Sequence, residues 1–403
     1  MPEIGEVARI VHYLRKHVAG KTIRDVRTQQ DDIVYGKVGT SASAFEKAMT
    51  GKKVLDARQQ GKYFWLVMSE PPHPLMHFGM SGWMKFSNDD SAYYKPTAKE
   101  ENPEWPPKYW KFVFEMDGDG KCEAAFVDAR RLGRIRLIDA PGEELRKVSP
   151  LKENGPDPVI DKDILTVDWL AQKMRSKRIP VKALLLDQAN ISGVGNWVGD
   201  EVLYQAKIHP EQYSNTFSDT QIKQLHDALI YVCGLACETL ADSDKFPEDW
   251  LMKHRWGKGK KDANKLPNGA SITFLKVGGR TSAVVPSVQK KTGAVAGDAG
   301  ISEQEDDEET ERKPNAKQRR NPNTASNKAA VNGSKRGRGK KEEQAEDVKQ
   351  EEEEEGKEDE PAPKRTKKGG AKKGANGAAA NVAGQKAAAS EPEGGRRRSS
   401  RNK

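Results

Sequence analysis

Cysteine is scarce in this chain, and its scarcity excludes two classes of protein. Only Cys122, Cys233 and Cys237 occur in 403 residues, too few for a disulfide framework or a four-cysteine zinc site, so a reducing compartment is expected. Cys233 and Cys237 would share one helical face, where small buried side chains are a simpler interpretation than metal ligands. A secretory leader and long apolar runs are also missing, so neither export nor a membrane span is expected.

The last part of the chain lacks large hydrophobic side chains. From Lys291 to Lys403 there is no Phe, Tyr, Trp, Leu, Met or Cys. Such a stretch cannot bury enough apolar surface to offset its chain entropy, so we expect residues 290–403 to be a disordered charged tail. Its basic clusters, at 335–341, 364–368 and 396–398, are typical of nuclear localisation or nonspecific nucleic-acid contact, the plain alternative being a solvated linker.

The rest of the chain has the composition of a folded protein. Residues 1–289 contain all eight Trp and all seven His, and this length suffices for two domains, which we place at 1–150 and 151–289. The formal net charge of +9 suits a polyanionic partner, although net charge alone is a weak argument.

Hydrophobic periodicity predicts an α+β fold. A helix is expected from residue 7 to Gly20, because apolar residues repeat there at helical spacing. Short runs of β type then predict a sandwich, with strands at 22–28, 53–57, 63–68, 75–84, 109–116, 122–128 and 135–138. After a Pro/Gly linker at 155–158 the pattern predicts helices at 167–174, 180–188, 196–207 and 219–241, then a hairpin at 271–276 and 281–285 turned by Gly278-Gly279.

The first residues predict an amine nucleophile. Removal of the initiator Met1 would make Pro2 the amino terminus, and its secondary amine would titrate near neutral pH and could attack a sugar's anomeric carbon to form an iminium. Glu3 and Glu6 follow closely enough to move the protons that this chemistry requires. The plain alternative is a processed end without a catalytic role.

A glycine turn predicts a second site. In the run Gly193-Val194-Gly195-Asn196 the glycines would leave backbone N–H groups exposed at the start of a helix, where the helix dipole favours a bound phosphate. For this piece alone, an ordinary helical corner with an Asn cap is the alternative.

Five motifs, in this order, resemble the formamidopyrimidine-DNA glycosylase family. They are Pro2-Glu3, Gln60-Gly61-Lys62-Tyr63-Phe64, His77-Phe78-Gly79-Met80-Ser81-Gly82, Asp128-Ala129-Arg130-Arg131-Leu132-Gly133 and the glycine turn. The resemblance spans about residues 2–286. It implies a β-sandwich joined to a helix-two-turn-helix domain with a hairpin finger, and DNA bound between them. It also implies a bifunctional enzyme that flips out a damaged base, cuts the glycosidic bond through a proline Schiff base and nicks the strand by β,δ-elimination.

The resemblance also implies a role for each matching residue. Pro2 matches the nucleophile, Glu3 the acid/base and Glu6 a second carboxylate that is structural or assists. Lys62 matches a lysine on the lesion phosphate, a solvated strand-end lysine being the alternative. The remaining matches are to DNA contacts: His77, Asn196 and Arg280 on the backbone, Met80 and Arg130 inserted into the base stack, and Leu132 where bacterial relatives carry an intercalating Phe.

Two segments depart from the bacterial pattern. Residues 257–289 contain no Cys or His, so the hairpin resembles the zincless finger of the plant and fungal branch, and we expect neither a metal nor another cofactor. The stretch 244–258 lacks the glycine-rich loop that caps 8-oxoguanine in bacterial relatives. We therefore expect formamidopyrimidines and hydantoins, which already disturb stacking, to be excised faster than 8-oxoguanine.

The sequence thus predicts a monomeric nuclear DNA glycosylase and AP lyase, without membrane association, acting on double-stranded DNA with oxidised bases or abasic sites. One alternative is a damaged-DNA-binding protein of the same fold with weak or no catalysis, against which the intact Pro2, Glu3 and Lys62 argue. Another is an N-terminal-proline tautomerase acting on small molecules, which would leave Asn196, Arg280 and the basic charge unused. Nothing in the sequence identifies a protein partner.

Overall fold

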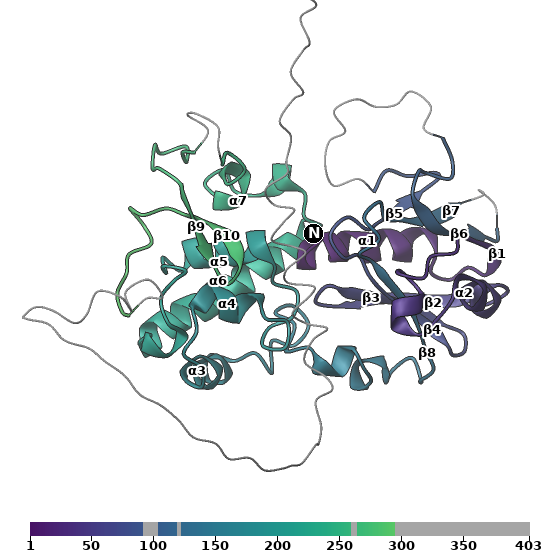
Figure 1. The fold of residues 1–403 in the computed structure, drawn as a ribbon, viewed down its shortest axis with the longest axis horizontal. Coiled ribbons are helices and arrows are strands. Elements are labelled where there is room, and N and C mark those ends of the chain that lie inside the picture. Colours follow the sequence, from purple (N-terminus) through teal and green to yellow (C-terminus); the bar gives the residue numbers. More distant parts are fainter. Residues whose placement is uncertain (92–103, 119–121, 259–263, 295–403) are drawn as a thin grey trace, which may run out of the picture. The chain divides into compact units, whose positions relative to one another are not determined.

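The computed structural model describes residues 1–91, 104–118, 122–258 and 264–294 (Figure 1). Residues 290–294 are part of the folded chain, because Tyr213 N donates to Ala294 O at 2.9 Å and Gln221 Nε2 donates to Thr292 Oγ1 at 2.8 Å. The predicted start of the disordered tail at residue 290 is therefore wrong. Residues 295–403 lie outside the described residues, and their disorder stays a prediction.

The N-terminal part contains two four-stranded antiparallel sheets, which confirms the predicted sandwich. One sheet has the order β1 (Ile23–Thr28), β6 (Trp110–Met116), β7 (Glu123–Val127) and β5 (Trp83–Phe86). The other has the order β2 (Val54–Gln60), β3 (Tyr63–Met68), β4 (His73–His77) and β8 (Arg134–Ile138). The single strand predicted at 75–84 is wrong, because a turn with Gly79 at φ +61° separates β4 from β5.

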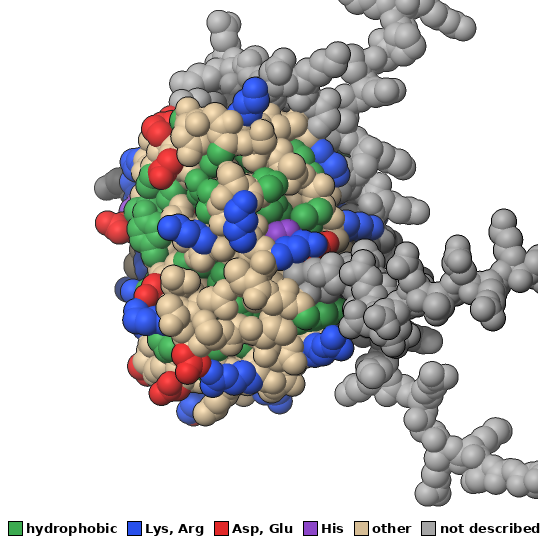
Figure 2. All heavy atoms as spheres, turned by 90° about the vertical axis from the view of Figure 1, so that its left-hand side faces the viewer, with side chains coloured by type: hydrophobic (Ala, Val, Ile, Leu, Met, Phe, Trp, Pro, Cys, Tyr) green, Lys and Arg blue, Asp and Glu red, His purple; other side chains and the backbone are tan. Residues whose placement is uncertain are grey.

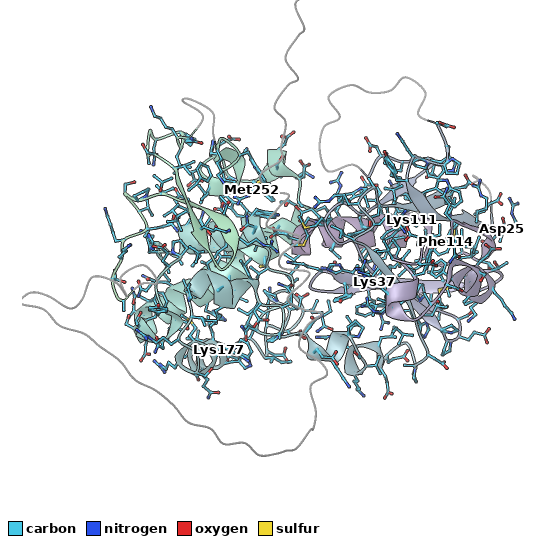
Figure 3. All side chains as sticks on the ribbon, viewed as in Figure 1. Asp25, Lys37, Lys111, Phe114, Lys177 and Met252 are labelled. Carbon is cyan, nitrogen blue, oxygen red and sulfur yellow. The ribbon has the colours of Figure 1, made fainter. Side chains whose placement is uncertain are left out.

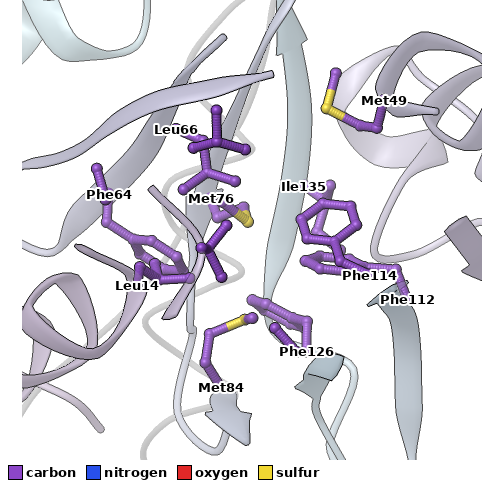
Figure 4. Packing of buried hydrophobic residues seen from close by; sticks show 14 of the residues in the cluster. Leu14, Met49, Phe64, Leu66, Met76, Met84, Phe112, Phe114, Phe126 and Ile135 are labelled. Carbon is purple, nitrogen blue, oxygen red and sulfur yellow. The ribbon is translucent and has the colours of Figure 1, made fainter. Parts of the chain in front are cut away.

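Aromatic and sulfur side chains fill the space between the sheets (Figure 4). Phe64 and Met76 come from one sheet and Phe112 and Phe126 from the other, and all four are fully buried. A helix that the sequence analysis did not predict, α2 (Ala42–Met49), adds Phe45 and Met49 to this core. Figure 3 labels Phe114 of the same core and Lys111, both on β6.

The first helix joins two cores. In α1 (Ile4–His17) the residues Val7, Ile10 and Leu14 belong to the sandwich core, whereas Ile4 belongs to the core of the helical part. The residues just before Ile4 are therefore fixed where the two parts of the chain meet.

The helical part is built around a long helix, α6 (Asp219–Glu238), which buries one face. Its other helices are α3 (Val167–Arg175), α4 (Val181–Leu186), α5 (Asn196–Gln205) and α7 (Leu251–His254). Over the described chain as a whole, single 3-10 turns lie at Gly36–Val38, Leu145–Lys147, Leu151–Glu153, Ser214–Thr216 and Ser243–Lys245. Cys233 is fully buried in α6 and Cys237 partly, as expected for small core residues. Among the described residues, no helix combines the length and hydropathy needed to cross a membrane.

The last element is an antiparallel hairpin of β9 (Thr273–Val277) and β10 (Arg280–Val284). Its two-residue turn needs glycine, because Gly278 and Gly279 have φ of +59° and +76°. A Cβ on Gly278 would lie 3.0 Å from Ala183 Cβ, so the turn is in contact with α4. In the described ranges, no group of three or more His, Cys, Asp or Glu side chains is arranged to hold a metal ion.

Candidate active site where α1 meets α5

The Glu3 side chain joins the start of α1 to the start of α5. Glu3 is 3% exposed. Its Oε1 accepts a hydrogen bond from Trp197 N at 3.0 Å, and its Oε2 accepts from Gly195 N at 2.9 Å and Val198 N at 3.0 Å. These are amides that the helix cannot satisfy internally. The N-terminus of α5 therefore holds a carboxylate of the same chain.

This arrangement corrects the predicted phosphate site at the glycine turn. The amides expected to bind phosphate are occupied by Glu3, and the N-cap of α5 is Gly195, with Asn196 as the first helical residue. A Cβ on Gly195 would lie 2.3 Å from Glu3 Cδ. Glycine is required at this position because the carboxylate occupies the space of a side chain.

Glu6 is the second buried carboxylate of the site. It is 4% exposed, and it accepts hydrogen bonds from Glu3 N and from Trp197 Nε1, both at 3.0 Å. Burial, and next the negative charge of Glu3, raise the pKa of Glu6 to about 7. Glu6 can therefore exchange a proton near neutral pH.

The terminal amine is placed among these groups. In the structure Met1 is present, and burial lowers the pKa of its amine, opposed by Glu3 and Glu6 and assisted by Lys62 and Arg130. A lowered pKa increases the neutral, nucleophilic fraction of an amine at physiological pH. Pro2 lies directly between this amine and Glu3 along the chain.

Lys62 is a buried lysine rather than a solvated one. It is 7% exposed, and burial lowers its pKa to about 8, with Glu3 and Glu6 opposing and Arg280 assisting. The turn before it is held by a buried carboxylate, since Gly61 N donates to Asp157 Oδ2 at 2.7 Å. The charges of Glu3 and Glu6 act on Lys62, so the predicted Lys62 belongs to the same site as the two glutamates.

His77, the last residue of β4, is a neutral donor. Its Nδ1 accepts from Gly79 N at 3.0 Å, so its proton is on Nε2. Burial, and next the charge of Lys62, lower the pKa of His77 to about 3. The imidazole can therefore donate one hydrogen bond to an anion without carrying a charge.

The wedge residues, which are the predicted base-stack contacts Met80, Arg130 and Leu132, lie on two loops that Asp128 joins through hydrogen bonds. Asp128 is fully buried and accepts from Ser81 Oγ at 2.7 Å, from Arg130 N at 3.1 Å and from Gly133 N at 2.6 Å. Met80 lies beside Ser81 on the first loop, and Arg130 and Leu132 lie on the second. All three wedge residues are at least partly exposed.

A second carboxylate fixes the same loop from its other side. Arg131 has φ +58°, unusual for a non-glycine residue, and donates from Nε and Nη2 to the two oxygens of Asp31, each at 3.0 Å. Lys111 Nζ also bonds Asp31, at 2.9 Å. Burial would raise the pKa of Asp31, but these hydrogen bonds outweigh it and hold the pKa well below its usual range.

Asn196 and Arg280 are brought together by the hairpin. Asn196 Nδ2 donates to Thr281 O at 3.0 Å, next to Arg280, whose charge acts on Lys62. The face that the helical part presents in Figure 2 carries scattered Lys and Arg side chains among hydrophobic ones, with Asp and Glu mostly toward its border.

Sequence comparison gives matches over both parts of the chain. Residues 1–135 match the formamidopyrimidine-DNA glycosylase N-terminal domain, and residues 155–247 match the formamidopyrimidine-DNA glycosylase H2TH domain. The chain is 39% identical over 315 residues to the formamidopyrimidine-DNA glycosylase of Arabidopsis thaliana, covering 76% of this chain and 77% of that one. It is 35% identical over 238 residues to the enzyme of that name from Pediococcus pentosaceus, covering 59% and 78%.

The chain belongs to the formamidopyrimidine-DNA glycosylase family. A solved structure agrees: that of the Lactococcus lactis formamidopyrimidine-DNA glycosylase bound non-covalently to DNA with an abasic site matches with a TM-score of 0.58 at 25% identity, covering 72% of this chain and all of that one. A mutant of the same Lactococcus lactis protein, in complex with Fapy-dG-containing DNA, matches with the same score and coverage.

Sequence reasoning missed the residues that hold this family site together. Asp157 stands in the segment interpreted only as a linker, Asp128 begins a quoted motif without a role, and Trp197 and Asp200 follow the glycine turn. An isolated Asp or Trp carries no periodic signal, so only the fold connects them to Lys62 or Glu6. Trp250, in the stretch compared with the bacterial cap, is 1% exposed and stacks on Phe246, so its indole is packed in the core of the helical part.

Proposed function

We propose that this chain is a bifunctional DNA glycosylase and AP lyase of base excision repair, acting on double-stranded DNA with oxidised bases or abasic sites. The observation that carries the proposal is the start of α1, where the buried carboxylates of Glu3 and Glu6 follow Pro2 closely and Glu3 is held by three main-chain amides of the α5 N-terminus. Family membership supports the glycosylase activity. The Lactococcus lactis relatives bound to DNA with an abasic site or Fapy-dG support the substrate class.

In the proposed mechanism, removal of Met1 makes the Pro2 nitrogen the nucleophile. The neutral amine attacks the anomeric carbon of the damaged nucleotide, the base leaves with its bonding electrons, and loss of the amine proton leaves a covalent adduct that rearranges to an iminium. Glu3 delivers a proton to the sugar oxygen as the ring opens. Glu6, with a pKa of about 7, is suited to receive the proton that the amine loses.

The same iminium supports strand cleavage. It withdraws electrons from the sugar, so a base can remove the C2′ proton and the 3′ phosphate leaves. Removal of a second proton, from C4′, then lets the 5′ phosphate leave. Lys62, His77, Asn196 and Arg280 are proposed to bind the phosphates, and Met80, Arg130 and Leu132 to fill the gap left by the flipped base.

Two finer properties follow from the sequence. Residues 257–289 offer no Cys or His, so we expect a zinc chelator to leave activity unchanged. With no cap expected over the base and Trp250 buried, single-turnover excision should be faster for formamidopyrimidines and hydantoins than for 8-oxoguanine opposite cytosine. Equal or faster release of 8-oxoguanine would contradict this ranking. Nuclear localisation stays a prediction from the basic clusters of the tail, which lie outside the described residues.

Borohydride trapping tests the chemistry. The processed protein should form a covalent adduct with duplex DNA containing an abasic site, and the adduct should map to Pro2. Pro2→Gly or retention of Met1 should abolish it, whereas Glu3→Gln should impair base excision more than cleavage at a preformed abasic site. An adduct on Lys62 in the wild type would refute the assignment, and no adduct with intact binding would favour the non-catalytic DNA-binding alternative.

A further inference from the structure

The free edge of the hairpin is bonded to side chains of α5. In an antiparallel pair turned by two residues, alternate residues direct their N–H and C=O groups away from the partner strand, and in β10 these are Thr281 and Ala283. Asn196 Nδ2 donates to Thr281 O, and Ala283 N donates to Asp200 Oδ2, each at 3.0 Å. Positions four apart on a helix are about 6 Å apart, close to the roughly 6.6 Å between alternate strand residues.

Asp200 is buried in a group of charges. It is 1% exposed and forms ion pairs with Lys182, which is fully buried, and with Arg255, whose Nη2 lies 2.7 Å and Nε 3.2 Å from Oδ2. Lys182 Nζ also donates to Asn196 O at 2.9 Å. A buried ion group of this kind seldom stabilises a protein more than apolar side chains of similar size would. Its directional bond to the hairpin therefore points to a role in geometry.

We propose that Asp200 is a positioning residue, which fixes the hairpin at Ala283 and thereby the position of Arg280 at the start of β10. This inference rests on the proposed function, in which Arg280 and Lys62 bind phosphate near the lesion. Lys182 and Arg255 compensate the charge of Asp200 and orient its carboxylate. The hairpin is thus held by two side chains of one helix, and the same helix begins at the amides that bind Glu3.

Two matched triple variants test the role of the Asp200 acceptor. K182M/D200N/R255M and K182M/D200L/R255M both remove every charge of the group, but only the first keeps a side-chain oxygen that can accept from Ala283 N. Affinity is measured for a duplex with a tetrahydrofuran abasic analogue over a range of salt. The D200N triple variant should bind within about threefold of wild type. The D200L triple variant should bind roughly tenfold more weakly and lose about one unit of salt slope, the loss also expected for Arg280→Ala.

A further substitution in the D200L triple variant distinguishes a failure of the positioning role from a failure of the proposed phosphate contact. Adding Arg280→Ala to the D200L triple variant should cause little further loss, because both changes remove the same contact. Equal binding by the two triple variants, or full additivity, would overturn the positioning role alone. If Arg280→Ala changes neither affinity nor salt slope, the proposed phosphate contact fails and this inference fails with it.

Ala283→Pro provides an independent variant should the triple variants not fold. Proline lacks the N–H that bonds Asp200, the position makes no backbone bond to β9, and the ion group stays intact. It should reproduce the loss of affinity and salt slope, and amide exchange should be faster in the rest of β10. Wild-type affinity with a cooperatively folded hairpin would overturn the proposal.

Discussion

Two parts of the site are held by α5 in different ways. Glu3 is held by main-chain amides at the start of the helix, so substitutions of the α5 side chains leave its three bonds in place. The hairpin that carries Arg280 is held by two α5 side chains, Asn196 and Asp200. The comparison teaches that the proposed acid depends on the absence of a side chain at Gly195, whereas the proposed phosphate contact depends on side chains being present.

The sharpest test of this comparison is Gly195→Ala. The added methyl group must displace the Glu3 carboxylate, so we expect the single-turnover excision rate at saturating enzyme to fall roughly 10²-fold, the scale of a lost general acid. Affinity for abasic-site DNA should change little. Gly234→Ala on α6 is the control, since nothing lies within 4 Å of a Cβ built there. If Gly195→Ala lost affinity but kept its excision rate, Gly195 would support DNA binding and not the proposed acid.

A smaller effect is expected from the pH dependence of binding through Lys62. Because its pKa is lowered to about 8, Lys62 is charged below that pH and loses its charge above it. The affinity of the wild type for abasic-site DNA should therefore fall up to about tenfold between pH 7 and pH 9, the loss of one phosphate contact. Lys62→Met should bind weakly at both pH values, without this step. Lys85→Met, at an exposed position of β5, serves as the control and should retain the step. If Lys62→Met showed the same fall in affinity between pH 7 and pH 9, the fall would come from another titrating group.

The smallest effect is expected at Trp197, which supports the site both through its main-chain amide and through its side chain. Its main-chain amide bonds Glu3 and its indole bonds Glu6. Trp197→Phe removes only the indole donor, so the Glu6 carboxylate loses a stabilising bond and its pKa should rise further above about 7. The acidic limb of the excision rate against pH should shift upward by less than about one unit, with the plateau within about threefold. Trp250→Phe, a matched buried indole, should not shift it, and an equal shift in both variants would contradict the role of the indole.

Much of the fold was predictable because it is periodic. The helix starting near Pro2, the sandwich, the helices α3 to α6 and the hairpin at Gly278-Gly279 were predicted from repeating patterns, and β3 was predicted with its observed bounds. The short helix α7 was not predicted. The strand predicted at 75–84 failed because Gly79 and Gly82 lie within an apolar stretch, where hydrophobicity hid the turn. The short helix α2 was missed because eight residues give too few repeats.

Individual residues of the candidate site were predictable, but the contacts between them were not. The motifs named Glu3, Glu6 and Lys62, and these three act on one amine in the structure. The glycine turn was correctly recognised as an anion site, but the expected anion was wrong, because the carboxylate that occupies it comes from a residue 192 positions earlier in the chain. No local pattern encodes a contact over that separation. The contributions of Asp157 and Asp200 were hidden for the same reason, since their partners Gly61 and Ala283 lie 96 and 83 positions away.

The separation between Glu3 and its partners also sets an order in time. The amino terminus is the first part of the chain to be synthesised, and α5 emerges from the ribosome nearly two hundred residues later. Until then Glu3 has no helix to hold it, and Ile4 has no core to enter. A nascent chain therefore carries the proposed nucleophilic amine before the proposed acid is fixed beside it, and we expect reactivity toward sugars only after both parts have folded.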